Sequence, residues 1–174
     1  MMTSTGERRA GANMGRPAVA RFPSAMRCPL DGVSLSAWQR FVAALEVQGV
    51  DAVSERGGFG SYDLRPKRLR DLGYTTDLRR VRARGGRQIY TCSFVAPWTQ
   101  ERFLADPLAQ LGALAQSMKL HQQDLRAGKI RLPDGLSLSG ALAILHRGGR
   151  GALAAWPDLF DHTRAVFERA RGAF

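Results

Sequence analysis

The sequence predicts a mainly α-helical fold with at most one small β-hairpin. Apolar residues recur at helical spacing in several segments, glycine or proline lies near the ends of most of them, and one segment combines β-branched with aromatic residues. A chain of 174 residues is long enough for one domain with a sizeable core. We expect this domain over residues 31–174. Residues 1–30 carry Gly, Pro, Ser and Arg without periodicity and are expected to form a weakly ordered basic segment.

The first predicted helix covers residues 34–49. Ser36 and Gln39 have the spacing of a capping box, and Gly49 is a typical helix end. The apolar stripe of this helix consists of Trp38, Phe41, Val42 and Leu45. Glu46 falls about 80° from Trp38 around the helix, at the margin of the stripe. A half-desolvated carboxyl group there has a raised pKa, which suits a general acid.

The remaining elements follow in order along the chain. Residues 50–64 form an irregular, glycine-containing passage, and Pro66 begins a short helix that ends at Gly73. The sequence does not decide whether residues 75–98 form a helix or a hairpin. RQIYTCSFV has strand character, and the preceding RGG suits a turn. Further helices are predicted to begin near residue 99, to cover residues 107–128 and 136–151, and to end the chain. The expected inward stripe of the long helix consists of Leu108, Leu111, Ala115, Met118 and Leu125.

The net charge of +11 comes mostly from arginine, in RPKRLR (65–70) and LRRVRARGGR (78–87). Such charge attracts nucleic acid, acidic lipid surfaces or anionic wall polymers, or it covers a solvated face of an arginine-rich protein. Zinc-finger spacing and RNP-type aromatic motifs do not occur, so nucleic-acid binding, if present, is non-specific and the less favoured partner.

The lack of a recognisable targeting signal and the presence of only two cysteines suggest that the protein is made in the cytoplasm. The sequence has neither a membrane span nor the apolar core of a signal peptide, so action at the cell wall would need release through a membrane lesion or packaging into a particle. Cys28 and Cys92 lie far apart and are expected to be separate thiols rather than a long-loop disulfide. His121, His146 and His162 are isolated, so we expect no metal site.

Four pieces of the sequence form a series in chain order: FVAALEVQGVDAV, GGFGSYDLRPKRLRDLGY, FLADPLAQ and SGALAILHRGG. Together they resemble the lysozyme-like lytic transglycosylase domains of phage and prophage proteins. In those domains a helix ends in Glu before Gly and Ala-Val, a Gly-x-Tyr-Gln loop leads to a Gly-aromatic pair, and Phe-Leu…Pro…Gln and Ser-Gly-x-Leu…His-x-Gly-Gly follow. The matching residues here are Glu46, Gly49, Ala52 and Val53; Gly60, Tyr62, Gly73 and Tyr74; Phe103, Leu104, Pro107 and Gln110; and Ser139, Gly140, Leu142, His146, Gly148 and Gly149. The similarity covers about residues 36–156.

The resemblance implies a lysozyme-like helical domain that cleaves peptidoglycan glycan strands without a cofactor or metal. Members of the family use one glutamate, which protonates the leaving oxygen and then assists the sugar's 6-hydroxyl in closing an anhydro ring. By this resemblance Glu46 is the general acid and base. Gly60, Ser61 and Tyr62 line the cleft, where the Tyr62 ring stacks on a sugar. His146 is structural or lines the cleft.

The chain departs from the family pattern at Asp63, which stands where the family has Gln, and in a loop about one residue shorter. Asp63 either supplies a second carboxylate that directs water, as in a lysozyme-type hydrolase, or impairs substrate binding. The second outcome leads to an alternative function: a non-catalytic structural or wall-binding component of a phage tail or injection-type particle, docked through residues 1–30. Glu55 is a rival acid in an irregular, exposed segment and ranks below Glu46.

Overall fold

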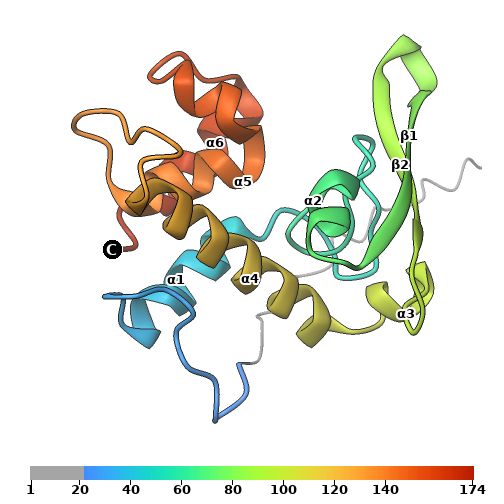
Figure 1. Cartoon of the computed structure of the whole chain (residues 1–174), viewed down its shortest axis with the longest axis horizontal. Helices are drawn as coiled ribbons and strands as arrows, with labels where there is room; N and C mark the ends of the chain where they lie inside the picture. Colours follow the sequence, from blue (N-terminus) through green and yellow to red (C-terminus); the bar gives the residue numbers. More distant parts are fainter. Residues whose placement is uncertain (1–21) are drawn as a thin grey trace, which may run out of the picture.

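A computed structural model describes residues 22–174, so most of the expected weakly ordered segment lies outside the described residues (Figure 1). The helices are α1 (Leu35–Leu45), α2 (Pro66–Asp71), α3 (Gln100–Leu104), α4 (Pro107–Arg126), α5 (Leu138–Ala154) and α6 (Asp161–Ala170). The strands β1 (Thr75–Arg82) and β2 (Gln88–Phe94) pair as an antiparallel hairpin. The mainly α fold with one small hairpin is thus confirmed, and the hairpin is the correct reading of the ambiguous segment.

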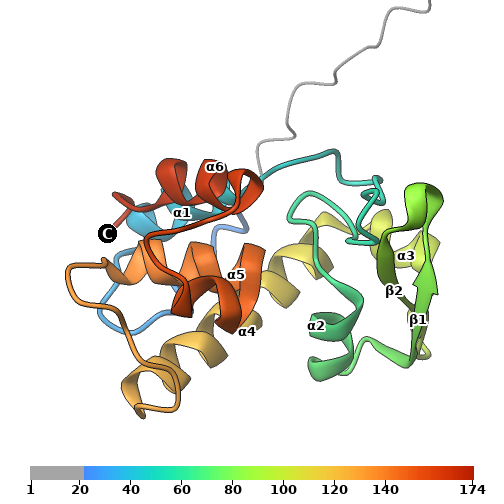
Figure 2. The same ribbon diagram turned by 90° about the horizontal axis from the view of Figure 1, so that it is seen from above.

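The elements form two groups that α4 connects (Figure 2). On one side, α6 packs against both α1 and α5. On the other side, α2 packs against both strands, and α3 lies at the end of the hairpin opposite its turn (Figure 1). The long helix α4 contacts α3 near its beginning and α5 further along, so it is the main rigid link between the two groups.

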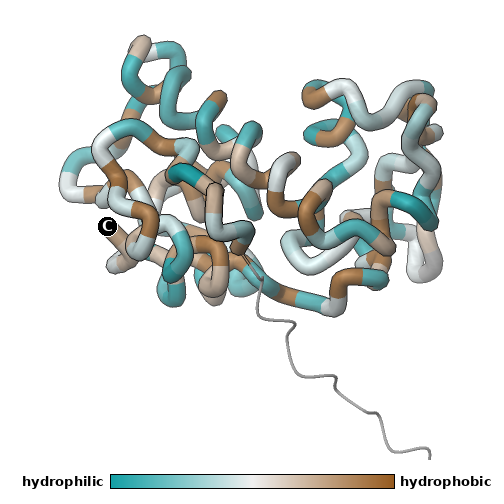
Figure 3. Tube along the Cα trace, turned by 90° about the horizontal axis from the view of Figure 1, so that it is seen from below, coloured by the Kyte–Doolittle hydropathy of each residue, from teal (hydrophilic) through white to brown (hydrophobic). Residues whose placement is uncertain are grey.

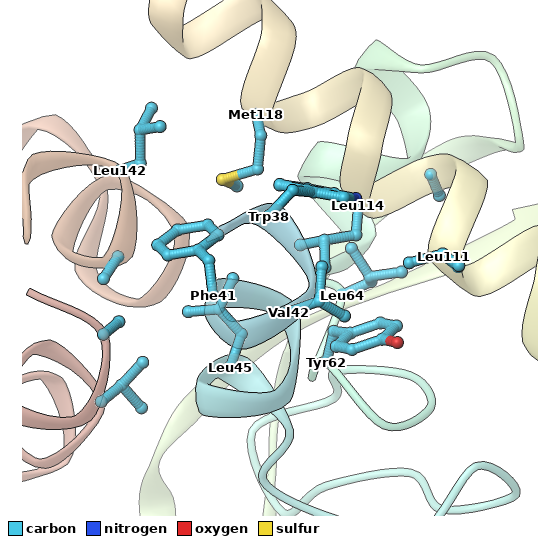
Figure 4. Packing of buried hydrophobic residues seen from close by; sticks show 14 of the residues in the cluster. Trp38, Phe41, Val42, Leu45, Tyr62, Leu64, Leu111, Leu114, Met118 and Leu142 are labelled. Atoms are coloured by element: carbon cyan, nitrogen blue, oxygen red, sulfur yellow. The ribbon is translucent and has the colours of Figure 1, made fainter. Parts of the chain in front are cut away.

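The main hydrophobic core surrounds α1 (Figure 4). The predicted stripe is confirmed, because Trp38, Phe41, Val42 and Leu45 are all fully buried. They pack against residues of α4 and α5, including Leu114, Met118 and Leu142. Burying aromatic and aliphatic side chains of this size is the principal force that holds such helices together.

The first helix begins where it was predicted, but the predicted capping residue and C-terminal end are wrong. Its N-cap is Ser34, whose side chain accepts a hydrogen bond from the Ala37 backbone N–H, so the capping box at Ser36 does not form. The helix ends at Leu45, before Gly49, and Glu46 is the C-cap residue with extended backbone angles. The chain leaves the helix here because the Val47 N–H donates to the Ser61 carbonyl instead of continuing the helical ladder.

The other helix signals have mixed outcomes. Gly73 ends α2 as predicted, with φ of 82°, and the Tyr74 N–H donates to the Leu69 carbonyl in the pattern of a Schellman motif. Ser137 is the N-cap of α5, and its side chain accepts a hydrogen bond from the Gly140 backbone N–H. Leu108 is wrong as a core residue, since it is 53% exposed. Instead, the polar side chains Gln110, Ser117, His121 and Gln122 are buried on α4.

The core extends further toward the N-terminus than the expected boundary at residue 31. Leu30 is buried, and Phe22, Met26 and Cys28 pack against the main core. Asp31 exchanges two backbone hydrogen bonds of 3.0 Å with the side chain of Gln122 on α4. Cys28 and Cys92 are free thiols, as predicted.

Hydrophobic and hydrophilic positions alternate along the described trace (Figure 3). None of the helices within residues 22–174 combines the length and apolar character needed to cross a membrane.

Candidate functional site

The loop of residues 58–64 is the point at which the four resembling sequence pieces meet. The Val47 N–H, next to Glu46, donates to the Ser61 carbonyl over 2.9 Å. The Ser61 N–H donates to Oε1 of Gln110 over 3.0 Å, and Nε2 of His146 donates to the Tyr62 carbonyl over 2.7 Å. Segments up to 84 positions apart in the sequence therefore hold one short loop in place.

Gln110 anchors this loop from α4. Its side chain is fully buried, and its amide nitrogen donates to the carbonyls of Val50 (2.9 Å), Phe103 (3.1 Å) and Leu104 (3.3 Å). With the bond from Ser61, one amide group joins the segment after α1, the loop and the end of α3. A buried amide with both ends satisfied specifies one arrangement of these segments.

Two glycines make this approach possible. A Cβ at Gly60 would lie 2.8 Å from Nε2 of Gln110 and closer still to Oε1, and the Gly60 φ of 68° favours glycine in any case. A Cβ at Gly58 would overlap with the carboxyl group of Asp63. Both glycines are therefore required by close packing around the loop.

Glu46 lies beside this loop, half-buried at the end of α1. Its intermediate exposure agrees with its predicted place at the margin of the apolar stripe. Burial raises the pKa of the Tyr62 hydroxyl, and the charge of Glu46 raises it further, so the two side chains are electrostatic neighbours. Glu55 is exposed, as expected for the rival acid.

Gly60, Ser61, Tyr62 and Asp63 are buried, and none of them is among the residues that line the groove described below, which corrects the prediction that they would line the cleft. Tyr62 is 2% exposed, and its ring packs beside Leu64 in the core, with the hydroxyl group directed away from the cluster (Figure 4). Because neither face of the ring is accessible, the predicted stacking of Tyr62 on a sugar is wrong for this conformation.

Asp63 is a structural ion-pairing residue. Its carboxylate pairs with Arg65 over 3.0 Å and with Arg147 of α5, and it accepts a hydrogen bond from the Ser54 hydroxyl. Asp63 also adopts a φ of 51°, a left-handed conformation that aspartate tolerates better than glutamine does. With both oxygens engaged and the side chain 1% exposed, this carboxylate is not available to direct a water molecule.

A groove of about 980 Å³ lies between the two groups of elements. One wall comes from Leu64 and the residues of α2, and the other from residues 145–163 of α5 and α6; His121 and Asp124 of α4 lie between them. Of the predicted site residues, His146 lines this groove, whereas Glu46 does not. Glu46 and His146 therefore both lie next to the loop, but only His146 is in contact with the groove.

Two of the three histidines that line the groove, His146 and His121, are neutral near pH 7 because burial lowers their pKa values. Burial lowers the pKa of His146 to about 4, although the Tyr62 carbonyl and Asp63 act in the opposite direction. Burial, followed by the charge of Arg68, lowers the pKa of His121 to about 3. Nε2 of His121 accepts a hydrogen bond of 2.8 Å from Arg68, which also requires the neutral ring.

Several groove residues were not predicted. Phe160 is 76% exposed at the groove, and its ring stacks on His162 with an interplanar angle of 12°. Arg147 lines the groove and directly follows His146 in the sequence. Its charge next to Gly148 and Gly149 was the sequence feature from which its place in the groove could have been predicted. His121 recurs eleven positions after Gln110 on the core face of α4, so its burial was predictable from helical spacing.

Comparison of the chain with protein-family models, with curated proteins and with solved structures finds no match.

Proposed function

We propose that this protein cleaves the glycan strands of peptidoglycan, with Glu46 as general acid and base, on a lysozyme-like helical domain. The observation that carries the proposal is the convergence of the four resembling pieces on the loop of residues 58–64. Pieces that resembled a helical core by chance would have no reason to meet through specific hydrogen bonds beside a half-buried glutamate.

In this mechanism Glu46 protonates the glycosidic oxygen as the bond to the anomeric carbon breaks. The same carboxylate then accepts the proton of the sugar's 6-hydroxyl as that oxygen attacks the anomeric carbon, which yields an anhydro sugar. The ion pairs of Asp63 support this outcome over hydrolysis, because a two-carboxylate hydrolase needs a second carboxylate free to act on water.

The groove would hold the glycan strand. Phe160 takes over the stacking role first expected of Tyr62, since it presents an exposed ring at the groove. His146 supports the loop through the Tyr62 carbonyl and lines the groove, so its role is positioning rather than proton transfer.

A second function is favoured by the position of Glu46 outside the lining of the groove and by the burial of Tyr62. It is the non-catalytic alternative: a wall-binding or structural component of a phage tail or similar particle. The docking role expected for residues 1–30 falls largely outside the described residues.

The test compares Glu46→Gln with Glu55→Gln on purified cell walls, by loss of turbidity. The enzymatic proposal expects that Glu46→Gln abolishes clearing and keeps both the circular dichroism spectrum and wall binding, while Glu55→Gln clears normally. Anhydro ends in the mass spectrum of the products would support the transglycosylase mechanism over hydrolysis. Full clearing by Glu46→Gln would refute the assignment, and binding without clearing by the wild-type protein would establish the second function.

A further inference from the structure

A second, smaller concavity lies between the hairpin and α2. It has a volume of about 290 Å³ and is open to solvent. We call it the hairpin pocket; its charged and aromatic lining residues are Arg56, Arg65, Lys67, Arg87 and Tyr90. None of the described residues that line it is acidic. Four cations from three segments of the chain thus surround one small concave surface.

The hairpin pocket continues into the groove, because Arg56, Arg65 and Lys67 line both. The groove adds Arg68, Arg147 and Arg150 along the same surface. Among the described residues, three carboxylates line the groove and offset this charge in part. Asp71 pairs with Arg70, Asp124 pairs with Lys129 and Arg150, and Asp158 lies between α5 and α6, away from the wall that α2 forms. The result is one continuous basic surface, concave at both ends.

Several of these guanidinium groups are held in place by internal contacts that neutralise them only in part. Arg65 donates to the Arg56 carbonyl over 2.9 Å and shares the single carboxylate of Asp63 with Arg147. Arg68 donates to the neutral ring of His121. Cations fixed by internal contacts lose little conformational entropy when they bind an anion, and guanidinium groups match the geometry of phosphate oxygens.

We propose that the hairpin pocket and the adjoining wall of the groove bind a chain of polyol units linked by phosphodiesters, of the kind carried by cell walls. A repeating anion suits cations that are spread along a continuous surface. Single-stranded nucleic acid is the less suitable ligand, because its binding sites combine charge with a series of aromatic platforms. Among the described residues that line the hairpin pocket, Tyr90, 44% exposed, is the one aromatic residue. The proposal does not require Glu46 to be catalytic.

The experiment measures binding of a fluorescent glycerol-phosphate oligomer to the full chain by anisotropy. The pocket variant Lys67→Gln/Arg87→Gln removes two exposed cations of the hairpin pocket. The matched control, Arg80→Gln/Arg82→Gln, removes two exposed cations from the same hairpin that line neither concavity. Both variants have the same net charge, so long-range attraction changes equally in both.

We expect the pocket variant to bind about tenfold more weakly or worse, and the control to lose less than about threefold, because only the pocket variant loses direct charged contacts. An equal loss in both variants would overturn the proposal in favour of diffuse attraction. Tighter binding of a single-stranded DNA with the same number of phosphates would overturn it in favour of nucleic acid. The same titration with Glu46→Gln gives an unchanged affinity whether or not the enzymatic proposal holds, so the two proposals can fail separately.

Discussion

Replacing Gly60 by alanine tests the packing that holds the candidate site together. The new Cβ would overlap with the side-chain amide of Gln110, and alanine would have to adopt a φ of 68°. The left-handed backbone alone costs about 1–2 kcal/mol. If Gln110 moves away, at least two of its four hydrogen bonds, three of which are buried, are lost, at about 1–3 kcal/mol each.

The alanine also restricts the unfolded chain, which offsets about 0.4–1 kcal/mol of this loss. We therefore expect Gly60→Ala to lower the free energy of unfolding by about 2–8 kcal/mol, a large part of the roughly 5–15 kcal/mol typical of a domain. Urea unfolding followed by circular dichroism measures this value. The control is Gly112→Ala, an exposed position inside α4 where a Cβ meets nothing within 4 Å.

Gly112→Ala should stabilise the protein by up to about 1 kcal/mol, because alanine is the better helix former. A Gly60→Ala protein within about 1 kcal/mol of the wild type would refute the reasoning. It would mean that neither the positive φ nor the contact with Gln110 constrains the loop.

Three further predictions follow from the groove and its surroundings. Asp63→Asn leaves two guanidinium groups without their carboxylate and should cost about 3–5 kcal/mol in urea unfolding, whereas Asp71→Asn, in a surface pair, should cost less than about 1 kcal/mol; equal effects would contradict the structural role of Asp63. The lowered pKa values of His146 (about 4) and His121 (about 3) mean that the unfolded chain binds more protons than the native protein below the ordinary histidine pKa of about 6.5, so the urea midpoint should fall as pH drops from about 6.5 to 4; an unchanged slope in His146→Gln would exclude a contribution from His146. Phe160→Ala should weaken binding of chitin oligosaccharides about fivefold and change stability by less than about 0.5 kcal/mol, as measured by calorimetry and urea unfolding; unchanged affinity would remove Phe160 from the glycan site.

The parts of the fold that depend on local patterns were predictable from the sequence. The stripe of α1, the proline start and glycine end of α2, and the helix near the C-terminus each depend on spacing or on one conformationally special residue. The end of α1 was not predictable, because a hydrogen bond between Val47 and Ser61 decides it, and that bond depends on the tertiary fold.

In the candidate site, too, some features follow from the sequence and others depend on the tertiary fold. Hydrogen bonds join the four sequence pieces at the loop of residues 58–64, but the sequence could not show which of their residues face solvent. Tyr62 was expected in a cleft and lies in the core, while Phe160, in a segment with no motif, is exposed at the groove. Exposure of an aromatic ring depends on how the two groups of elements pack, which spacing along one helix does not encode.

The amide of Gln110 has a consequence for how the molecule responds to its medium. Its four hydrogen bonds join three segments through groups that do not titrate, inside a chain of net charge +11. Salt screens the attraction between the protein and polyanions, and acid alters the histidines, but neither acts on an uncharged amide bonded to backbone groups. The protein can therefore vary its hold on a charged surface with ionic strength while the geometry around Glu46 stays the same.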